Sequence, residues 1–240
     1  MTTDAQSSPS SDPVAVITGA GSGIGRALAV GLAQLNYRLV LGGRTRESLS
    51  ATAALTGADC EVVGCDVSDP VQAQTLIARA VERFGRVDAL VNNAGDAPLL
   101  PIDKTTPEAL QRCFAINALA PGYTIAAAWP HMVRQRSGCI VNVSTLGTID
   151  PFPGFFAYAA AKAAVNLMAR SCANEGKRHA IRAFAVAPGA VETAMLRKNF
   201  NERSLPPAAC LAPSDVAGVI IACLRGERDA ENGQVIVVKR

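Results

Sequence analysis

The chain has 240 residues, 49% of them apolar, which is enough to bury a large core and lies within the range of one α/β domain. Its net charge of +3 is small and dispersed, without the basic blocks or interleaved aromatic residues of a nucleic-acid-binding protein. No apolar run approaches the roughly 20 residues needed to span a bilayer, so a membrane protein is not expected either.

The predicted elements alternate between strand and helix along the chain. Residues 1–12 are polar and Ser-rich and lack the basic start and apolar stretch of a signal peptide, so a disordered tail is expected there. Short apolar runs then predict strands at residues 14–17, 38–43, 60–65, 87–91, 139–143, 181–187 and 234–238. Between them lie predicted helices at residues 26–35, 46–55, 69–84, 106–136, 158–179 and 213–225, the fourth with an interruption near Pro121.

This alternation predicts one parallel sheet covered by helices on both of its faces. The nearly continuous apolar strands agree, because both faces of such a sheet are buried. No linker, composition break or internal repeat divides the chain, so we expect a single domain over residues 13–240.

The sequence TGAGSGIG, residues 18–25, follows the first strand and leads into the first helix. Its glycines allow a positive φ and a close approach of another molecule, and a helix N-terminus adds unpaired N–H donors and a positive dipole end. A tight turn that only packs helix against strand is the alternative. The pattern favours a phosphate or pyrophosphate site, with a G-x-x-x-G-x-G spacing on Gly19, Gly23 and Gly25.

A ligand cleft is predicted along the edge of the sheet where the strands end, because ligands of open parallel sheets bind outside the carboxyl ends of the strands. Six strands here end in polar or glycine-rich residues, which outlines such a cleft. These endings are residues 18–25, Gly43-Arg44, Asp66-Val67, 93–95, Ser144-Thr145 and Pro188-Gly189.

The end of the second strand indicates which dinucleotide would bind. A site for NAD usually carries an Asp or Glu about 20 residues past the glycines, bonded to the ribose 2′-hydroxyl. Gly43 stands there instead, and Arg44 and Arg46 follow it. A guanidinium can bind a 2′-phosphate through charge-assisted hydrogen bonds, so the sequence favours NADP(H) over NAD(H). The alternative is that Arg44 only solvates the end of a strand.

Tyr158 and Lys162 are spaced i, i+4 in a predicted helix and so share one of its faces. A free tyrosine, with a pKa near about 10, is a poor base at neutral pH, and a nearby ammonium lowers this pKa. The pair is therefore a candidate general acid/base for a carbonyl and its alcohol. Alone, the same spacing is also typical of an ordinary amphipathic helix.

Seven cysteines are scattered without C-x-x-C pairs, mostly in apolar segments, which is typical of free thiols in a reducing cytoplasm. Only His131 and His179 could join them as metal ligands, and a surface or helix-end place is expected for both. No metal site is predicted.

Together these motifs resemble the short-chain dehydrogenases/reductases over residues 13–240. In chain order they are TGAGSGIG, the NNAG that ends at Gly95, Asn117, a Ser-Thr pair after the fifth strand, Tyr158-x-x-x-Lys162 and Pro188-Gly189. The resemblance implies a Rossmann-like, doubly wound parallel sheet of about seven strands with helices on both faces. It also implies hydride transfer between NADP(H) and the carbonyl or secondary alcohol of a small molecule, in a homotetramer or homodimer built on the two long central helices.

The resemblance also assigns roles to single residues. Tyr158 would donate a proton to the carbonyl oxygen in reduction, Lys162 would hold the nicotinamide ribose and bias the pKa of Tyr158, and Asn117 would hold a water that links Lys162 to solvent. The dinucleotide would further contact Thr18, Gly19, Gly21, Ser22, Gly23, Ile24, Gly25 and Arg44, with Asp66 and Val67 at the adenine, Asn93, Ala94 and Gly95 at the ribose and sheet centre, and Pro188, Gly189, Val191 and Thr193 on the nicotinamide side.

The substrate-binding hydroxyl departs from the family pattern, in which it belongs to a serine. Counting back from Tyr158 by the family's spacing gives Thr145, which can donate the same hydrogen bond from a stiffer and bulkier side chain. Ser144 stays the alternative. Because neighbouring strand residues point to opposite faces, only one of the two hydroxyls should reach the substrate.

Residues 190–212 would form the family's substrate lid. Its Arg197 and Lys198 either attract an anionic substrate or are ordinary exposed charges. Phe152, Phe155 and Phe156 are expected to form a wall of an apolar substrate pocket. The alternative is that they pack beneath the loop or at a subunit interface.

The leading interpretation is an NADPH-dependent carbonyl reductase or the reverse alcohol dehydrogenase. A dinucleotide sensor or scaffold of the same fold without turnover is the alternative, and Thr145 is the feature in its favour. A Rossmann-like transferase is a third hypothesis, but such an enzyme would not need Tyr158 and Lys162 on one helical face. The substrate stays open among 3-oxoacyl thioesters, ketosteroids, sugars and xenobiotic carbonyls.

Overall fold

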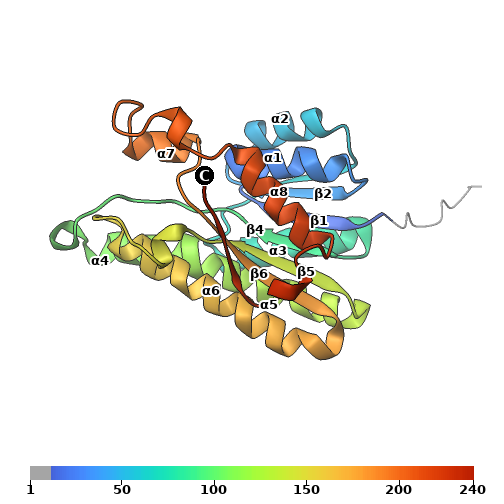
Figure 1. Ribbon diagram of the computed structural model, residues 1–240. Helices are drawn as coiled ribbons and strands as arrows, with labels where there is room; N and C mark the ends of the chain where they lie inside the picture. Colours follow the sequence, from blue (N-terminus) through green and yellow to red (C-terminus); the bar gives the residue numbers. More distant parts are fainter. Residues whose placement is uncertain (1–11) are drawn as a thin grey trace, which may run out of the picture.

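The computed structural model describes residues 12–240, and seven parallel strands form its central sheet (Figure 1). Residues 1–11 of the predicted tail lie outside the described residues. The strand order, β3-β2-β1-β4-β5-β6-β7, is that of a doubly wound sheet and confirms the predicted fold class. The strands are β1 (Val14–Thr18), β2 (Arg38–Gly43), β3 (Cys60–Gly64), β4 (Ala89–Asn92), β5 (Gly138–Val143), β6 (Ile181–Pro188) and β7 (Val235–Val238).

Helices cover both faces of this sheet (Figure 1). The first helix begins at Gly23, earlier than predicted, because the last glycines of TGAGSGIG form its first turn. Within the described part of the chain, no helix combines the length and the apolar character needed to cross a membrane. The α-helices are α1 (Gly23–Ala33), α2 (Arg46–Thr56), α3 (Pro70–Phe84), α4 (Pro107–Phe114), α5 (Ala120–Gln135), α6 (Phe156–Gly176), α7 (Ala194–Asn199) and α8 (Pro213–Leu224).

Alternate residues of the central strands enter two separate cores. Ala15 and Ile17 of β1 pack on the side of α1, α2 and α8, whereas Val14 and Val16 pack on the side of α3, α5 and α6. Each central strand is therefore buried on both faces, which explains its nearly continuous apolar sequence. The edge strands β3 and β7 are only partly buried.

The long helix predicted at residues 106–136 is interrupted by a π-helical turn, Ala115–Leu119, between α4 and α5. The interruption was expected near Pro121, which instead sits in the first turn of α5. A π-helical turn widens the helix locally, and such turns are frequent at functional sites. This one carries Asn117.

A buried chain of polar side chains joins α5, β4, β5 and α6. Thr124 Oγ1 donates to Asn92 Oδ1 (2.6 Å), Asn92 Nδ2 donates to Asn142 Oδ1 (3.0 Å), and Asn142 Nδ2 donates to the carbonyl oxygen of Val165 (3.1 Å). All three donating side chains are buried. Because the partners satisfy one another in a low dielectric, this chain fixes where α6, and with it Tyr158, lies against the sheet.

Asn142→Leu is expected to lower the free energy of unfolding by about 1–3 kcal/mol, because it leaves the buried amide of Asn92 without its acceptor. Urea denaturation measures this change. Asn174→Leu, at an exposed position of α6, is the control and should change the stability by less than about 0.5 kcal/mol. Equal losses in the two variants would contradict a structural role for the buried chain.

Candidate active site

The glycine turn after β1 is bare because side chains have no room there. Gly19 and Gly23 have positive φ angles of 67° and 51°, which L side chains rarely adopt. A Cβ on Gly25 would lie 2.4 Å from the carbonyl oxygen of Gly19, and a Cβ on Gly19 would lie 2.9 Å from the Cα of Ala94. The backbone at the start of α1 is thus open to a ligand, and no acidic residue stands in the first turn of this helix. The geometry fits the predicted phosphate cradle.

Thr18 and Asn93 hold this turn against β4. The Asn93 side-chain amide donates to the carbonyl oxygens of Thr18 (2.9 Å) and Gly19 (3.1 Å). The backbone N–H groups of Asn93 and Ala94 both donate to Thr18 Oγ1 (3.0 Å each). The sequence predicts a cofactor contact for both residues, whereas the structure uses their side chains to shape the turn itself.

Arg26, which no sequence motif marks, supports the same turn from the side of α2. Its Nη2 donates to the carbonyl oxygen of Gly21 (2.5 Å) and its Nε to Thr52 Oγ1 (3.2 Å). Ser48 of α2 packs so closely on Gly21 that a Cβ there would lie 2.5 Å from the serine oxygen. No motif marks Arg26, because its side-chain partner, Thr52, comes from a helix that follows another strand.

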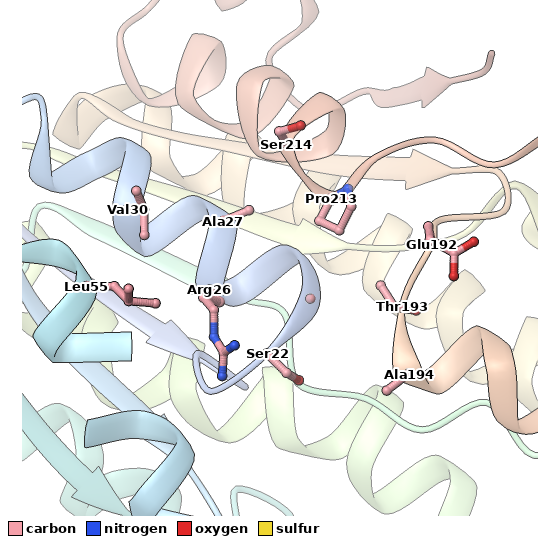
Figure 2. Close-up of a pocket in the computed structure, with 11 residues that line it drawn as sticks. Ser22, Arg26, Ala27, Val30, Leu55, Glu192, Thr193, Ala194, Pro213 and Ser214 are labelled. Carbon is pink, nitrogen blue, oxygen red and sulfur yellow. The ribbon is translucent and has the colours of Figure 1, made fainter. Parts of the chain in front are cut away.

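A cavity of about 560 Å³ opens beside the turn, between α1, α2 and the segment that leads into α7 and α8 (Figure 2). Part of it belongs to the predicted cofactor site, since Ser22, Gly23 and Thr193 border it. Figure 2 shows the Arg26 side chain reaching from α1 toward the turn. The other lining residues are Ala27, Val30, Leu55, Glu192, Ala194, Pro213 and Ser214.

Arg44 follows the last residue of β2 and is exposed. Within residues 12–240 its guanidinium makes no hydrogen bond or ion pair, so it is free to bind a ligand. At the end of β3, the Asp66 carboxylate accepts hydrogen bonds from the backbone N–H (3.0 Å) and hydroxyl (2.7 Å) of Ser68. Val67 beside it is almost fully buried.

Tyr158 and Lys162 lie together in the first half of α6, and both are buried. Lys162 Nζ lies 6.0 Å from the centre of the Tyr158 ring and donates a hydrogen bond to the carbonyl oxygen of Val143 (2.8 Å). The ring of Phe155 packs edge-on against that of Tyr158, with 5.2 Å between the centroids. The predicted pair is therefore brought together at the end of β5.

Burial dominates the acid–base properties of this pair. It raises the pKa of Tyr158 to about 12, against the opposite effect of a hydrogen bond with the Thr145 side chain. It also lowers the pKa of Lys162 to about 8. The pKa of Tyr158 is therefore raised, whereas the sequence predicts a lowered value, because burial is the largest influence on the phenol. At neutral pH Tyr158 is a neutral phenol, which suits a proton donor.

Asn117 holds the loop that follows β4. Its Nδ2 donates to the carbonyl oxygens of Asp96 (2.7 Å) and Cys113 (2.9 Å), and its Oδ1 accepts from the N–H of Asp96 (3.2 Å). A Cβ on Gly95 would lie 2.8 Å from Asn117 Oδ1 and 3.4 Å from Lys162 Nζ. Gly95 therefore lets Asn117 and Lys162 approach the same stretch of backbone. These contacts use both N–H groups of the Asn117 amide, so a water held by this residue would bond to its Oδ1 or to its backbone.

The two hydroxyls after β5 point in different directions, as the strand alternation predicts. Ser144 is buried, and its Oγ lies 3.5 Å from the carbonyl oxygen of Lys162, toward the backbone of α6. Thr145 is partly exposed, its side chain acts to lower the pKa of the Tyr158 phenol, and its Oγ1 accepts from the N–H of Gly147 (3.2 Å). Ser144 thus faces the backbone of α6, and Thr145 is the more exposed of the two hydroxyls.

The segment after β6 runs from the sheet to the glycine turn. Gly189 donates its N–H to Val238 (3.0 Å), and Val191 forms an isolated bridge with Leu211. Thr193 caps α7 by accepting from the N–H of Leu196 (3.2 Å). A Cβ on Gly23 would lie 3.1 Å from the Thr193 methyl group, so this residue closes over the turn.

Inside the predicted lid, residues 190–212, the charge of Arg197 is already paired. Its guanidinium contacts the Glu192 carboxylate and donates to the carbonyl oxygen of Leu205 (2.8 Å). It therefore stabilises the segment and is not a free anion-binding group. Lys198 is exposed, and Asn199 Nδ2 donates to the carbonyl oxygen of Ala97 (2.7 Å), which ties α7 to the loop after β4.

The three phenylalanines ahead of α6 have different surroundings. Phe155 packs against Tyr158, and Phe152 packs edge-on against Phe155 at 6.2 Å between centroids. Phe152 and Phe156 are exposed. Of the three rings, Phe155 is thus the one that packs against Tyr158.

The cysteines are all free thiols, and all but Cys60 are buried. Over residues 12–240, no three or more His, Cys, Asp or Glu side chains gather closely enough to hold a metal ion.

Comparison with known proteins adds independent information. A family model described as short chain dehydrogenase matches residues 13–204. The protein named as ketoacyl reductase 2 of the granaticin polyketide synthase in Streptomyces violaceoruber is 34% identical over 250 residues, which cover 99% of this chain and 97% of that one. Levodione reductase of Leifsonia aquatica is 36% identical over 207 residues, covering 82% and 78%.

Solved structures agree with these relatives. The crystal structure of a levodione reductase superposes with a TM-score of 0.89 at 30% sequence identity, covering 95% of this chain and 96% of that one.

Proposed function

The chain belongs to the short-chain dehydrogenase/reductase family, and from this premise we propose that it is an NADP(H)-dependent carbonyl reductase with Tyr158 as its general acid. The observation that carries the proposal is the cluster of Tyr158, Lys162 and Thr145 at the same edge of the sheet as the bare glycine turn. The relatives are named for reducing levodione or a ketoacyl group, which supports a ketone as the substrate.

The residues present fit a nicotinamide dinucleotide, the cofactor that this family typically binds. Gly19 and Gly25 leave no room for side chains, so the pyrophosphate could approach the backbone at the start of α1. Arg44 would bind the adenosine 2′-phosphate, which supports NADP(H) over NAD(H). When bound, the dinucleotide supplies or accepts the hydride at its nicotinamide ring.

The chain's own residues supply the proton and the orientation of the substrate. The Tyr158 phenol, neutral at pH 7, would pass its proton to the carbonyl oxygen as this oxygen gains charge. The Thr145 hydroxyl, which influences the pKa of Tyr158, would donate a hydrogen bond to the same oxygen and hold it in place. The Lys162 ammonium, 6.0 Å from the ring, would stabilise the phenolate that remains. We assign this hydroxyl role to Thr145 because Ser144 faces α6.

The proposal is tested by titrating the purified protein with NADPH and NADH and then following NADPH oxidation with a panel of ketones. Tight NADPH binding with turnover supports it. Binding without turnover on any ketone would favour a dinucleotide sensor, and binding of neither dinucleotide would contradict a cofactor site.

We also infer a homotetramer or homodimer built on α5 and α6 in a reducing compartment such as the cytoplasm. Exposed Phe156 and Leu167 on α6 and the free thiols support these inferences. Light scattering of the eluted protein tests the first, and a monomer would contradict it.

Arg44→Ala is expected to weaken NADPH binding by about 10- to 100-fold and NADH binding hardly at all, because only NADPH carries the 2′-phosphate. Calorimetric titration with each dinucleotide gives the two dissociation constants. Arg46→Ala, which removes an equal charge from the exposed start of α2, is the matched control. Equal losses for NADPH and NADH would remove the argument for phosphate recognition.

A further inference from the structure

Asp96 occupies a position beside the catalytic groups that none of the motifs covers. The residue before it, Gly95, is so close to Lys162 that a Cβ there would lie 3.4 Å from the ammonium nitrogen. The residue after it, Ala97, packs against the cluster that contains Tyr158. The two neighbours of Asp96 in the chain therefore lie beside Lys162 and the cluster of Tyr158, the proposed acid.

Three elements hold the backbone of this loop in place. Asn117 bonds both the N–H (3.2 Å) and the carbonyl oxygen (2.7 Å) of Asp96. Asn199 of the predicted lid donates to Ala97, and the N–H of Leu100 donates to Gly154 (2.9 Å) in the loop ahead of α6. These hydrogen bonds fix the backbone of Asp96, so its side chain starts from a defined position.

The Asp96 carboxylate is exposed and, in the described part of the chain, takes part in no hydrogen bond or ion pair. Its negative charge nevertheless affects buried groups of the site, since it contributes to raising the pKa of the Tyr158 phenol and of the Cys113 thiol. The nearby cation Lys162 is buried and bonded to Val143, and Arg197 of the lid is paired with Glu192. The rim of the site on this side therefore has a negative charge that remains available to a substrate.

We propose that Asp96 is a specificity-determining residue that favours ketones carrying an ammonium or another hydrogen-bond donor near the carbonyl and disfavours anionic ketones. The inference rests on the proposed carbonyl reductase function and narrows its substrate class. The physical reason is that Gly95 and Ala97, on either side of Asp96, border Lys162 and the cluster that contains Tyr158, so a substituent of a ketone held at Tyr158 would come within range of this charge. At such distances opposite charges attract and like charges repel strongly enough to change kcat/KM by about 10-fold in each direction.

The test compares three phenyl ketones of opposite or no charge: phenacylamine, propiophenone and benzoylpropionate. Their kcat/KM values are measured with NADPH at slightly acidic pH, where the amine is protonated. Asp96→Asn should lower the ratio of kcat/KM for phenacylamine to that for benzoylpropionate by about 100-fold relative to the wild type, because it removes both the attraction and the repulsion. Raising the salt concentration should lower the ratio in the wild type, which a merely structural role of Asp96 would not produce.

Asp103→Asn is the matched control, because it removes an exposed carboxylate from the segment that follows the same loop. It should leave the ratio of the wild type unchanged. The inference is overturned if the ratio is the same in the wild type and Asp96→Asn, or if both variants change it equally. Wild-type protein that oxidises NADPH neither with these three ketones nor with any ketone of the wider panel contradicts the proposed function itself, so the two failures can be told apart.

Discussion

Tyr158→Phe is expected to lower the turnover of ketones by about 10²–10⁴-fold, the range typical of a lost general acid. The substitution removes only the hydroxyl that would protonate the carbonyl oxygen. The ring stays packed against Phe155, at 5.2 Å between centroids, so the shape of the pocket is kept. The dissociation constant of NADPH should therefore change by less than about 2-fold. Steady-state kinetics and a fluorescence titration measure the two quantities on the same preparation.

The control for this variant is Tyr37→Phe, because Tyr37 lies at the opposite edge of the sheet beside Asp88 and Arg182. It should retain the turnover of the wild type. Turnover of Tyr158→Phe within about 10-fold of the wild type would contradict the proposed mechanism. A parallel loss of NADPH affinity would instead indicate a disturbed site.

The fold could be predicted from the sequence because its signals are local. Central strands such as β1 and β5 are buried on both faces, and this requirement appears directly as an uninterrupted apolar run. Helix ends could also be predicted, because their signals are local. Asp69 caps α3 through its own side chain, and Gly57 ends α2 in a left-handed conformation. The π-helical turn at Asn117 has no such signal, since it depends on how α4 and α5 pack.

The sequence predicted which residues lie at the site, but not which hydrogen bonds and ion pairs they form. Motif spacing brought Tyr158, Lys162 and the glycine turn to one edge, because parallel strands end there together. The direction of the tyrosine pKa shift was not predictable, since it depends on burial by residues from other elements. Arg26 and the pairing of Arg197 with Glu192 were not predicted for a different reason: the partners Gly21 and Glu192 are near in the sequence, but spacing alone does not show which way a long side chain points.

Gly25→Ala is expected to weaken NADPH binding by more than about 100-fold and to destabilise the protein. The added Cβ would lie 2.4 Å from the carbonyl oxygen of Gly19 and 2.6 Å from Asn93 Nδ2, both closer than atoms can approach. The turn and Asn93 must therefore move apart, which breaks the hydrogen bonds from Asn93 to Thr18 and Gly19. A displaced turn no longer presents its backbone N–H groups to the pyrophosphate.

Gly218→Ala separates this effect from the general consequence of replacing a glycine. Gly218 lies in α8, and a Cβ there meets no atom within 4 Å, so alanine should stabilise the helix by about 0.5–1 kcal/mol and leave NADPH affinity unchanged. Thermal unfolding and calorimetric titration of both variants give stability and affinity independently. If Gly25→Ala keeps wild-type affinity for NADPH, the glycine turn is not where the dinucleotide binds. If it loses affinity with an unchanged melting temperature, the turn can shift at no cost in stability, and the close contact with Asn93 serves binding alone.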